Sequence, residues 1–492
     1  MPIDILPDNV LLEIFSFCID DPFEYESSHA RDWQRLVHVC QRWRGLIFAS
    51  PRRLDLHLRC SHGTPVRENL VSWPVTLPLV LDYYRFSRDG ISPEDEDNIV
   101  AALEHPGRVL HIRILVNSSL MKKVITALRE SFPVLTHLDL TSCLTCHDSV
   151  QPVISRKILG GSNIPHLQHL CLTGISIPQL PSPFLSARNL VSLQLYQMIA
   201  DGYVSPDALA RSLAVLTRLK HLSISFYGDM TFSEQLRLRG HSYPQMRATL
   251  TALTEIDYQG ESEYLEDFLA RIDTPRVDSL TTDYFRHRIQ ASQLSRFLER
   301  TETLKIDQFT RARLYFYPHS SFFGLSHSQE AWTESHLNLE IMGSGSFEGL
   351  EAQVRDKVQL IGQLSAVFSK VDDLFAHGDS PVESGEMGLA EWLPLFRLFP
   401  AVKTLRLSGG LAVHVASALE DTTEEMVTDV FPALSLIRIA KCEDGPRRKD
   451  GEDDWMEQVG SMERFLSLRQ LSGCSVRVIN PEDELAEVEQ RW

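Results

Sequence analysis

The stretch Cys143-Leu144-Thr145-Cys146-His147 has residue types and spacing that could do chemistry. It matches C-x-x-C-H, the pattern that attaches a c-type haem to a protein. No export signal accompanies it, and Cys143 is also explained by a repeat described below. A zinc site would need a second pair of ligands at short spacing, and none is evident. We therefore expect no metal and no cofactor here.

Three histidines, His137, His169 and His221, occupy equivalent positions, each one residue before a leucine. Imidazoles repeated in this way could bind a ligand or respond to pH. A polar residue is expected at such a position in any case, and Ser192 and Glu255 occupy it elsewhere. The favoured interpretation is a solvated sheet face.

Other short motifs are weak. The glycine-rich segment 343–349 has Glu348 where a dinucleotide-binding loop needs its third glycine. The basic cluster at 447–449 lies inside an acidic stretch and would at most be a nuclear signal. No Ser/His/Asp set or nucleotide loop stands out, so we expect a protein that is not an enzyme. A site assembled from residues distant in the sequence is the remaining catalytic alternative.

A recurring pattern, apolar-x-x-apolar-x-apolar, must position these side chains. Its last positions alternate with period two, which predicts a short strand with one buried face. The central residues of the clear copies follow one another at intervals of 23 to 34 residues. These consecutive copies centre on Leu138, Leu170, Leu193, Leu222, Ile256, Leu280 and Leu304, two further clear copies centre on Leu405 and Ile437, and weaker ones centre on Leu81, Ile112, Leu339 and Leu374.

The segments between these strands favour helices. One begins after Ser205, a suitable N-cap followed by a proline, and others begin near Ser262 and Gln290. Cys143 and Cys442 follow their strands as the cysteine of L-x-x-L-x-L-x-x-C does in leucine-rich repeats. One strand–helix unit cannot bury its own apolar edge, so the units must stack. The sequence predicts an α/β fold over residues 55–480, a curved leucine-rich-repeat solenoid with parallel strands on its concave face, and an acidic end at 481–492.

Composition restricts the partners. The 492 residues include 66 acidic and 48 basic ones, for a formal net charge of −18, which would repel nucleic acid and anionic membranes. No apolar run is long enough to span a bilayer, and the N-terminus lacks the features of a secretory signal. With eight scattered cysteines, we expect reduced thiols and a cytoplasmic and/or nuclear location.

Two amphipathic stretches, residues 6–18 and 36–51, precede the repeats. Each has an apolar stripe at helical spacing, and the second helix should end near Ser50-Pro51. About fifty residues in short helices cannot enclose all these side chains. They must either cap the first repeat or bind another protein. The stripes are Val10, Leu11, Ile14, Phe15 and Cys18, and then Leu36, Val39, Cys40, Trp43 and Ile47.

Residues 1–54 resemble an F-box, particularly its fungal form with a long insertion between the helices. The resemblance rests on Leu6-Pro7, Leu11-x-x-Ile14-Phe15, Leu36-x-x-Val39-Cys40-x-x-Trp43 and the closing Ser50-Pro51. An F-box attaches a substrate receptor to the adaptor subunit of an SCF-type ubiquitin ligase. By that resemblance the adaptor-binding surface would be formed or supported by Leu6, Pro7, Leu11, Ile14, Phe15, Leu36, Val39, Cys40 and Trp43.

The expected function is therefore a non-catalytic substrate receptor that holds an unidentified target protein on its repeats. The alternative is a repeat scaffold whose N-terminal helices only cap the array and have no role in ubiquitin transfer. Target contacts are expected at strand positions between the leucines, namely His137, Asp139, His169, Gln194, His221, Asp257, Lys305 and Arg406.

Overall fold

The computed structural model forms two compact units, which we call unit 1 (residues 1–208 and 212–219) and unit 2 (residues 209–211 and 220–492). The boundary falls inside the predicted repeat region. The structure describes residues 5–17, 32–51, 53–54, 56–84, 91–143, 151–154, 158–161, 164–177, 180, 182–198, 204–227, 247–285, 289–304, 309–317, 320–327, 336–342, 350–378, 388–440 and 462–479. The acidic end at 481–492, the basic cluster, the glycine-rich segment, Cys18 and Cys442 lie outside these residues.

Unit 1 begins with three short helices, α1 (Asp8–Ser16), α2 (Asp32–Val37) and α3 (Gln41–Ala49). The second amphipathic stretch is broken rather than continuous, because Cys40 has extended backbone angles and caps α3. Its Sγ accepts a hydrogen bond from the Trp43 amide at 3.5 Å. The predicted end near Ser50-Pro51 is confirmed, since Ser50 is the C-cap.

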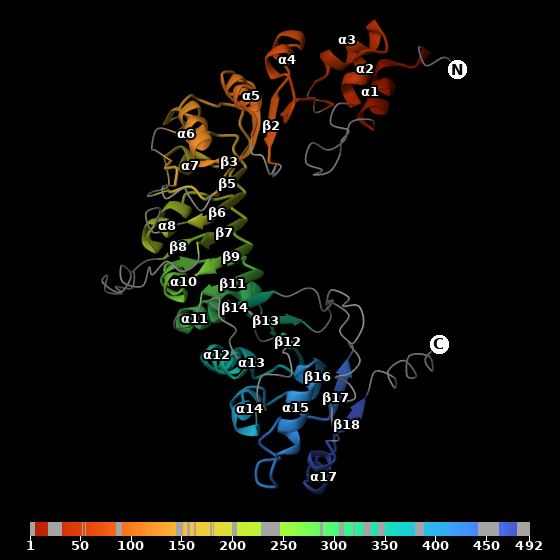
Figure 1. The fold of residues 1–492 in the computed structure, drawn as a ribbon, viewed down its shortest axis with the longest axis vertical. Helices are drawn as coiled ribbons and strands as arrows, with labels where there is room; N and C mark the ends of the chain where they lie inside the picture. The colour runs from red at the N-terminus through yellow and green to blue at the C-terminus, as the bar shows by residue number, and fades with distance from the viewer. Residues whose placement is uncertain are drawn as a thin grey trace. The chain divides into compact units, whose positions relative to one another are not determined.

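The sheet of unit 1 is parallel throughout its described strands, which run in chain order. They alternate with helices that lie on one face and leave the other open (Figure 1). The strands are β1 (Leu58–Ser61), β2 (Leu79–Tyr83), β3 (Val109–Asn117), β4 (His137–Cys143), β5 (His169–Thr173) and β6 (Ser192–Met198), and the connecting helices are α4 (Val66–Ser72), α5 (Pro93–Leu103), α6 (Ser118–Ala127) and α7 (Ser182–Ser186).

The predicted central residues of these repeats pair with one another across the sheet of unit 1. Ile112 lies opposite Leu138, Leu138 opposite Leu170, and Leu170 opposite Leu193. All four side chains are buried. The apolar row that the pattern predicts is therefore the core between the sheet and its helices. The predicted N-cap Ser205 is also confirmed, because its Oγ accepts from the Ala208 amide at the start of α8 (Pro206–Leu213).

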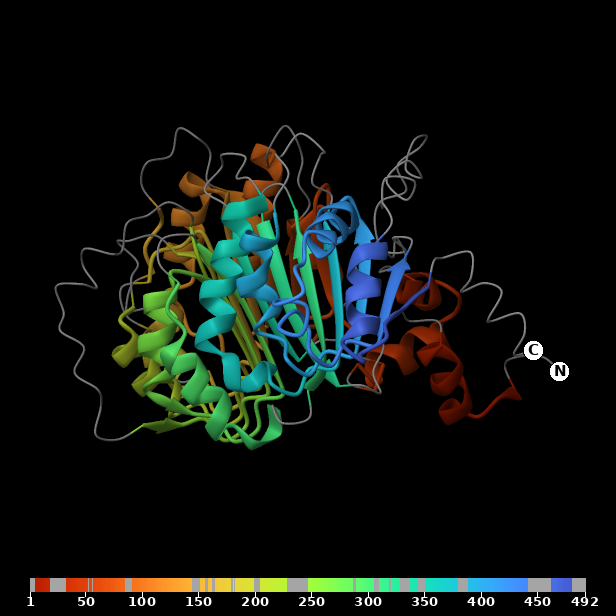
Figure 2. The same ribbon diagram turned by 90° about the horizontal axis from the view of Figure 1, so that it is seen from below.

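Unit 2 continues the same architecture, with helices packed along one face of its strands (Figures 1 and 2). A short pair, β8 (Ala248–Thr249) with β10 (Ile272–Asp273), stands apart from the main sheet. The order in the main sheet is β7 (His221–Phe226), β9 (Glu255–Gly260), β11 (Ser279–Phe285), β14 (Leu337–Met342), β13 (Ser320–His327), β12 (Phe309–Phe316), β15 (Asp373–Gly378), β16 (Thr404–Gly409), β17 (Leu436–Ala440) and β18 (Arg477–Ile479).

The helices of unit 2 connect these strands. Among the described helices of the chain, none is long and apolar enough to cross a membrane. The helices of unit 2 are α10 (Ser262–Leu269), α11 (Ser292–Arg300), α12 (Leu350–Gln363), α13 (Ser365–Phe368), α14 (Leu389–Phe396), α15 (Leu411–Glu420) and α17 (Glu463–Leu471).

Strand β13 departs from the parallel arrangement predicted by the repeats, since it runs antiparallel to both β12 and β14. Only residues 317–319 separate β12 from β13. A parallel return needs a crossover of a dozen residues or more, so the second strand can only fold back. The predicted strand at Leu304 is wrong, because this residue ends a 3₁₀ turn (Glu302–Leu304) after α11. The position beside β11 is taken by β14, where Leu337 pairs with Leu280.

A buried carboxylate joins two successive helices of unit 2, α10 and α11. Glu266 of α10 accepts hydrogen bonds from the Gln293 and Leu294 amides of α11 at 2.6 and 2.8 Å. Burial raises the pKa of Glu266, although these bonds act in the opposite direction. The first amides of a helix have no partner within it, so a carboxylate from the preceding helix satisfies them and fixes the stacking of one repeat on the next.

Helix α12 holds the hairpin β12–β13 through two polar side chains. Lys357 Nζ donates to the Phe322 carbonyl at 2.7 Å, and Gln353 Nε2 donates to the Tyr317 carbonyl at 2.7 Å. Lys357 is 1% exposed, and burial lowers its pKa to about 7. The side-chain amine of Lys357 is therefore only about half protonated near neutral pH.

We expect Lys357 to make the protein more stable as pH rises from about 7 towards about 10.4, the pKa of lysine in an unfolded chain. In that window the unfolded chain binds a proton that the folded chain has released, so the free energy of unfolding rises by at most about 1.4 kcal/mol per pH unit. Urea unfolding gives the free energy of unfolding at each pH between 7 and 9. The slope of this free energy against pH should be smaller in Lys357→Met, by up to the amount that corresponds to one bound proton. Equal slopes in the two proteins would contradict the assignment.

Candidate functional site

The N-terminal helices leave part of their apolar surface uncovered. Leu11 and Phe15 are fully buried, and Trp43 packs on Phe15 with ring centroids 4.7 Å apart. By contrast, Ile14 is 37% and Val39 58% exposed. The described residues include thirteen exposed large hydrophobic side chains, and five of them belong to this small module. We call these five the N-terminal apolar surface: Ile5, Val10, Ile14, Phe17 and Val39.

Arg42 connects the two sequence segments that carry this surface. Its guanidinium donates to the Leu6 carbonyl at 2.7 Å and to Asp8 Oδ1 at 2.6 Å. The Leu6-Pro7 segment is thereby held against the start of α3, next to Cys40. Pro7 is exposed, whereas Leu6, Leu36 and Cys40 are half-buried. Of the nine predicted adaptor-binding residues, Leu11, Phe15 and Trp43 support the surface from inside rather than forming it.

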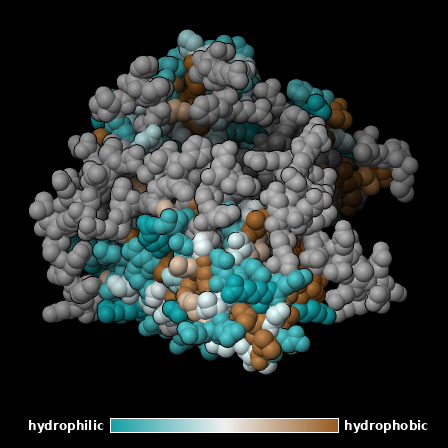
Figure 3. All heavy atoms as spheres, turned by 60° about the horizontal axis from the view of Figure 1, so that its bottom comes forward, coloured by the Kyte–Doolittle hydropathy of each residue, from teal (hydrophilic) through white to brown (hydrophobic). Residues whose placement is uncertain are grey.

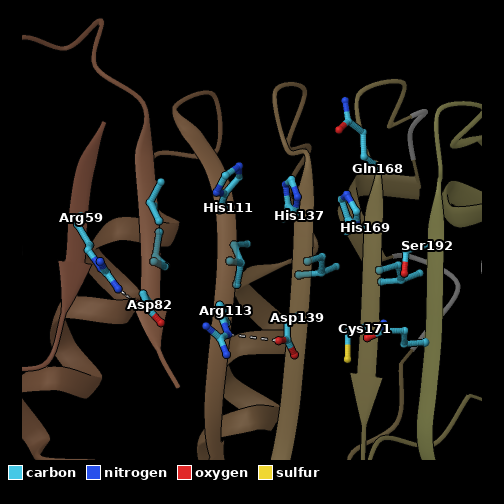
Figure 4. Close-up of a pocket in the computed structure, with 16 residues that line it drawn as sticks. Arg59, Asp82, His111, Arg113, His137, Asp139, Gln168, His169, Cys171 and Ser192 are labelled. Carbon is cyan, nitrogen blue, oxygen red and sulfur yellow. Dashed lines mark hydrogen bonds and ion pairs between the residues drawn. The ribbon is translucent and has the colours of Figure 1, made fainter. Parts of the chain in front are cut away.

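The open face of the sheet in unit 1 carries a depression with a volume of about 580 Å³. Two rows of side chains line it, each contributed by neighbouring strands (Figure 4). The histidine row consists of His111, His137 and His169. The charge row consists of Asp82, Arg113 and Asp139, with Arg59 paired to Asp82. Gln168, Cys171, Ser192 and Gln194 complete the lining towards β6.

The histidine row is a line of neighbouring imidazole rings, of which His137 and His169 are stacked and His111 meets His137 edge to face. The centroids of His111 and His137 are 4.3 Å apart, as are those of His137 and His169, and the latter two rings are nearly parallel. Burial, reinforced by the neighbouring imidazoles, lowers the pKa of His111 to about 3 and that of His137 to about 4. The two rings are therefore neutral at neutral pH. His111 was missed by the sequence analysis, although it precedes Ile112 as His137 precedes Leu138.

The charge row alternates in sign across the strands. Arg113 Nε lies 3.6 Å from Asp139 Oδ2, and the guanidinium lies over the Tyr84 ring at 4.1 Å. Burial raises the pKa of Asp139 even though Arg113 lowers it. Burial also raises the pKa of Cys171 to about 12. The thiol is therefore neutral at neutral pH and adds no charge to the row.

The predicted target contacts that the structure describes in unit 2 interact with neighbouring side chains of the same unit. His221 Nδ1 lies 2.6 Å from Glu255 Oε2. Burial, followed by repulsion from Glu255, raises the pKa of Asp257 to about 6. Arg406 makes two hydrogen bonds of 3.0 Å to the carboxylate of Asp373. Lys305 lies outside the described residues.

The structure thus gathers four of the eight predicted target contacts in one place: His137, Asp139, His169 and Gln194 all line the depression in unit 1. Within the described residues, no group of three or more His, Cys, Asp or Glu side chains is arranged to hold a metal ion. Cys146 and His147 of the C-x-x-C-H stretch are not among those residues.

Two solved structures are similar to this chain at a low level. The leucine-rich repeat-containing protein LegL7 from Legionella pneumophila is 13% identical, with 82% of this chain and 97% of that chain covered and a TM-score of 0.25. A leucine-rich-repeat protein from Leptospira interrogans is 10% identical, with 81% and 97% covered and a TM-score of 0.26. No family model matches the chain, and no curated protein does.

TM-scores this low do not support a fold assignment. The fold is assigned instead from the strand pairing within this chain. Parallel strands with paired leucines, alternating with helices packed on one face, define a mixed α/β protein of the leucine-rich-repeat solenoid class. Leu374, Leu405 and Ile437 repeat in unit 2 the leucine row of unit 1.

Proposed function

We propose that this protein is a non-catalytic substrate receptor of an SCF-type ubiquitin ligase. Its N-terminal helices would bind the adaptor subunit of the ligase, and the open face of its repeats would bind the target protein. The contribution to ubiquitin transfer would be proximity, because holding two proteins together raises the effective concentration of the reacting groups.

The observation that carries this proposal is the N-terminal apolar surface. Ile14 and Val39, two of the residues that the F-box resemblance places at the adaptor surface, are exposed in this chain. Leu11, Phe15 and Trp43 form a small core beneath them. A module that served only as a cap for the first repeat would gain by burying these side chains, since each is worth about 1.5 to 3 kcal/mol when removed from water.

The double variant Ile14→Asp, Val39→Asp should lose capture by the purified adaptor subunit. Both side chains are exposed, so the fold should tolerate the change, whereas a carboxylate placed in an apolar interface without a partner is costly. We expect the captured amount to fall at least about tenfold, because two central contacts of an interface are lost. The measurement is a pulldown from purified components.

The matched control is Val71→Asp, Val75→Asp. These valines of unit 1 are 89% and 72% exposed, so the control introduces the same charge outside the N-terminal helices. It should be captured like the wild type. Equal losses in the two double variants, or no capture of the wild type, would favour the alternative of a repeat scaffold without a role in ubiquitin transfer.

A further inference from the structure

The charge row in unit 1 alternates in sign from strand to strand, but the next strand position, where a positive charge would continue the row, holds a neutral residue. Strand pairing places Asp82 opposite Arg113, Arg113 opposite Asp139, Asp139 opposite Cys171, and Cys171 opposite Gln194. The signs are negative, positive and negative, followed by a small neutral thiol. Neighbouring strands are about 4.8 Å apart, so a group placed over Cys171 would have Asp139 on one side and Gln194 on the other.

The charges that line the depression favour a cation at this position. Arg59 and Arg113 are already paired with Asp82 and Asp139, and His111 and His137 are neutral at neutral pH. Each of the two guanidiniums is therefore already compensated by a carboxylate. On its β5 side Asp139 faces the neutral thiol of Cys171 rather than a second cation, and Cys171 and Thr141 supply only neutral hydrogen bonds to it. Burial raises the pKa of Asp139, so a cation added on the β5 side would stabilise the carboxylate. The net charge of −18 also attracts positive partners.

The shape of the position favours a planar cation. A guanidinium carries donors on several edges, so it can bond the Asp139 carboxylate and the Gln194 amide oxygen at once. An ammonium carries its three donors on a single nitrogen, so its hydrogen bonds span a shorter distance than those of a guanidinium. The exposed ring of His169, two residues before Cys171 on β5, offers a flat wall for the aliphatic part of the side chain.

We propose that the depression in unit 1 binds an arginine side chain from an extended segment of the target protein, with its guanidinium over Cys171 between Asp139 and Gln194. This inference rests on the proposed role of the repeat face in target binding and specifies the chemistry of the target.

Saturation-transfer NMR on the full chain tests the proposal with the peptide acetyl-Gly-Arg-Gly amide. The comparison peptides replace arginine by citrulline, which is planar and neutral, by lysine, which is charged but not planar, or by glutamate. We expect binding of the arginine peptide, dissociation constants at least about fivefold weaker for citrulline and lysine, and no binding of the glutamate peptide. Absence of transfer to the arginine peptide, or equal transfer to citrulline or glutamate, would overturn the proposal.

Two variants locate the site. Asp139→Asn removes the charge with little change of shape, and Cys171→Leu fills the position of the guanidinium; each should weaken binding of the arginine peptide about tenfold. The control Glu104→Gln removes an equally negative, exposed side chain of unit 1 outside the depression and should bind like the wild type. An equal effect of the control would mean that only the general negative field attracts the peptide.

The two proposals fail independently. The variant Ile14→Asp, Val39→Asp should keep its affinity for the arginine peptide, because neither residue lines the depression. Asp139→Asn should still be captured by the adaptor. If the wild type is captured by the adaptor but does not bind the arginine peptide, only the arginine site is overturned. If the wild type binds the peptide but is not captured, only the ligase role is overturned.

Discussion

Replacing Arg469 by methionine should destabilise the C-terminal repeats of unit 2 by about 2 to 6 kcal/mol, because two buried carbonyls lose their donor and each unsatisfied acceptor costs about 1 to 3 kcal/mol. Arg469 of α17 is fully buried. Its guanidinium donates to the carbonyls of Leu434, Val427 and Phe431 at 2.9, 3.2 and 3.4 Å. Methionine keeps the apolar stem of the side chain but removes the donor of the Leu434 and Val427 carbonyls in a dry site, whereas the Phe431 carbonyl still accepts from the Leu434 amide at 2.9 Å.

The loss should be local as well as large, because each repeat contacts only its neighbours. Phe431 has a positive φ of 46°, a conformation that costs energy in a non-glycine residue and persists only where its surroundings hold it. Without Arg469, hydrogen exchange should accelerate first in β17 and α17, while the amides of β9 and β11 keep their protection. Urea unfolding measures the total loss.

Arg464→Met is the matched control, since Arg464 lies on the same helix and is exposed. It loses the same charge and should change the free energy of unfolding by no more than about 0.5 kcal/mol. Similar losses in the two variants would mean that net charge rather than the buried hydrogen bonds of Arg469 stabilises this end of the chain.

The strands and their buried leucine row could be predicted from the sequence, because they follow from a pattern with a short period. The leucines that pair across unit 1 all follow the period-two alternation, and a strand with one buried face has no other way to arrange such a sequence. Strand direction is different, because it depends on the length of the connection, and β13 returns antiparallel to β12 after a short turn. Leu304 is buried as predicted but belongs to a turn.

The candidate site could be predicted only in part for a similar reason. Repeat position identifies which side chains share a row, and His137, Asp139, His169 and Gln194 were found in this way. Repeat position does not identify the ion pairs formed across strands, such as those of Arg59 with Asp82 and Arg113 with Asp139. The first repeats match the leucine pattern only weakly, so their residues are difficult to align with those of the later repeats. In the space-filling view of Figure 3, hydrophilic and hydrophobic residues are interspersed over the described part of the face shown. Hydropathy alone would not have singled out an interaction surface there.

Gly409 at the end of β16 lies where the backbones of two successive repeats approach each other closely. Gly409 pairs with Gly378 of β15 and has a φ of +66°. A Cβ at Gly409 would lie 2.7 Å from the Gly378 carbonyl oxygen and 3.1 Å from the His377 ring. Both the backbone angle and the available space therefore require glycine.

Gly409→Ala should accordingly lower the free energy of unfolding by about 2 to 5 kcal/mol, from the cost of a left-handed alanine together with the overpacking against β15. The clash involves backbone, so it cannot be relieved by moving a flexible side chain. Gly362→Ala is the control within the same unit. Gly362 lies in α12, where no atom would approach its Cβ within 4 Å, and alanine should stabilise the helix by about 0.5 to 1 kcal/mol. Urea unfolding of both variants gives the comparison, and a Gly409→Ala protein as stable as the wild type would mean that β15 and β16 are further apart at this point than the register requires.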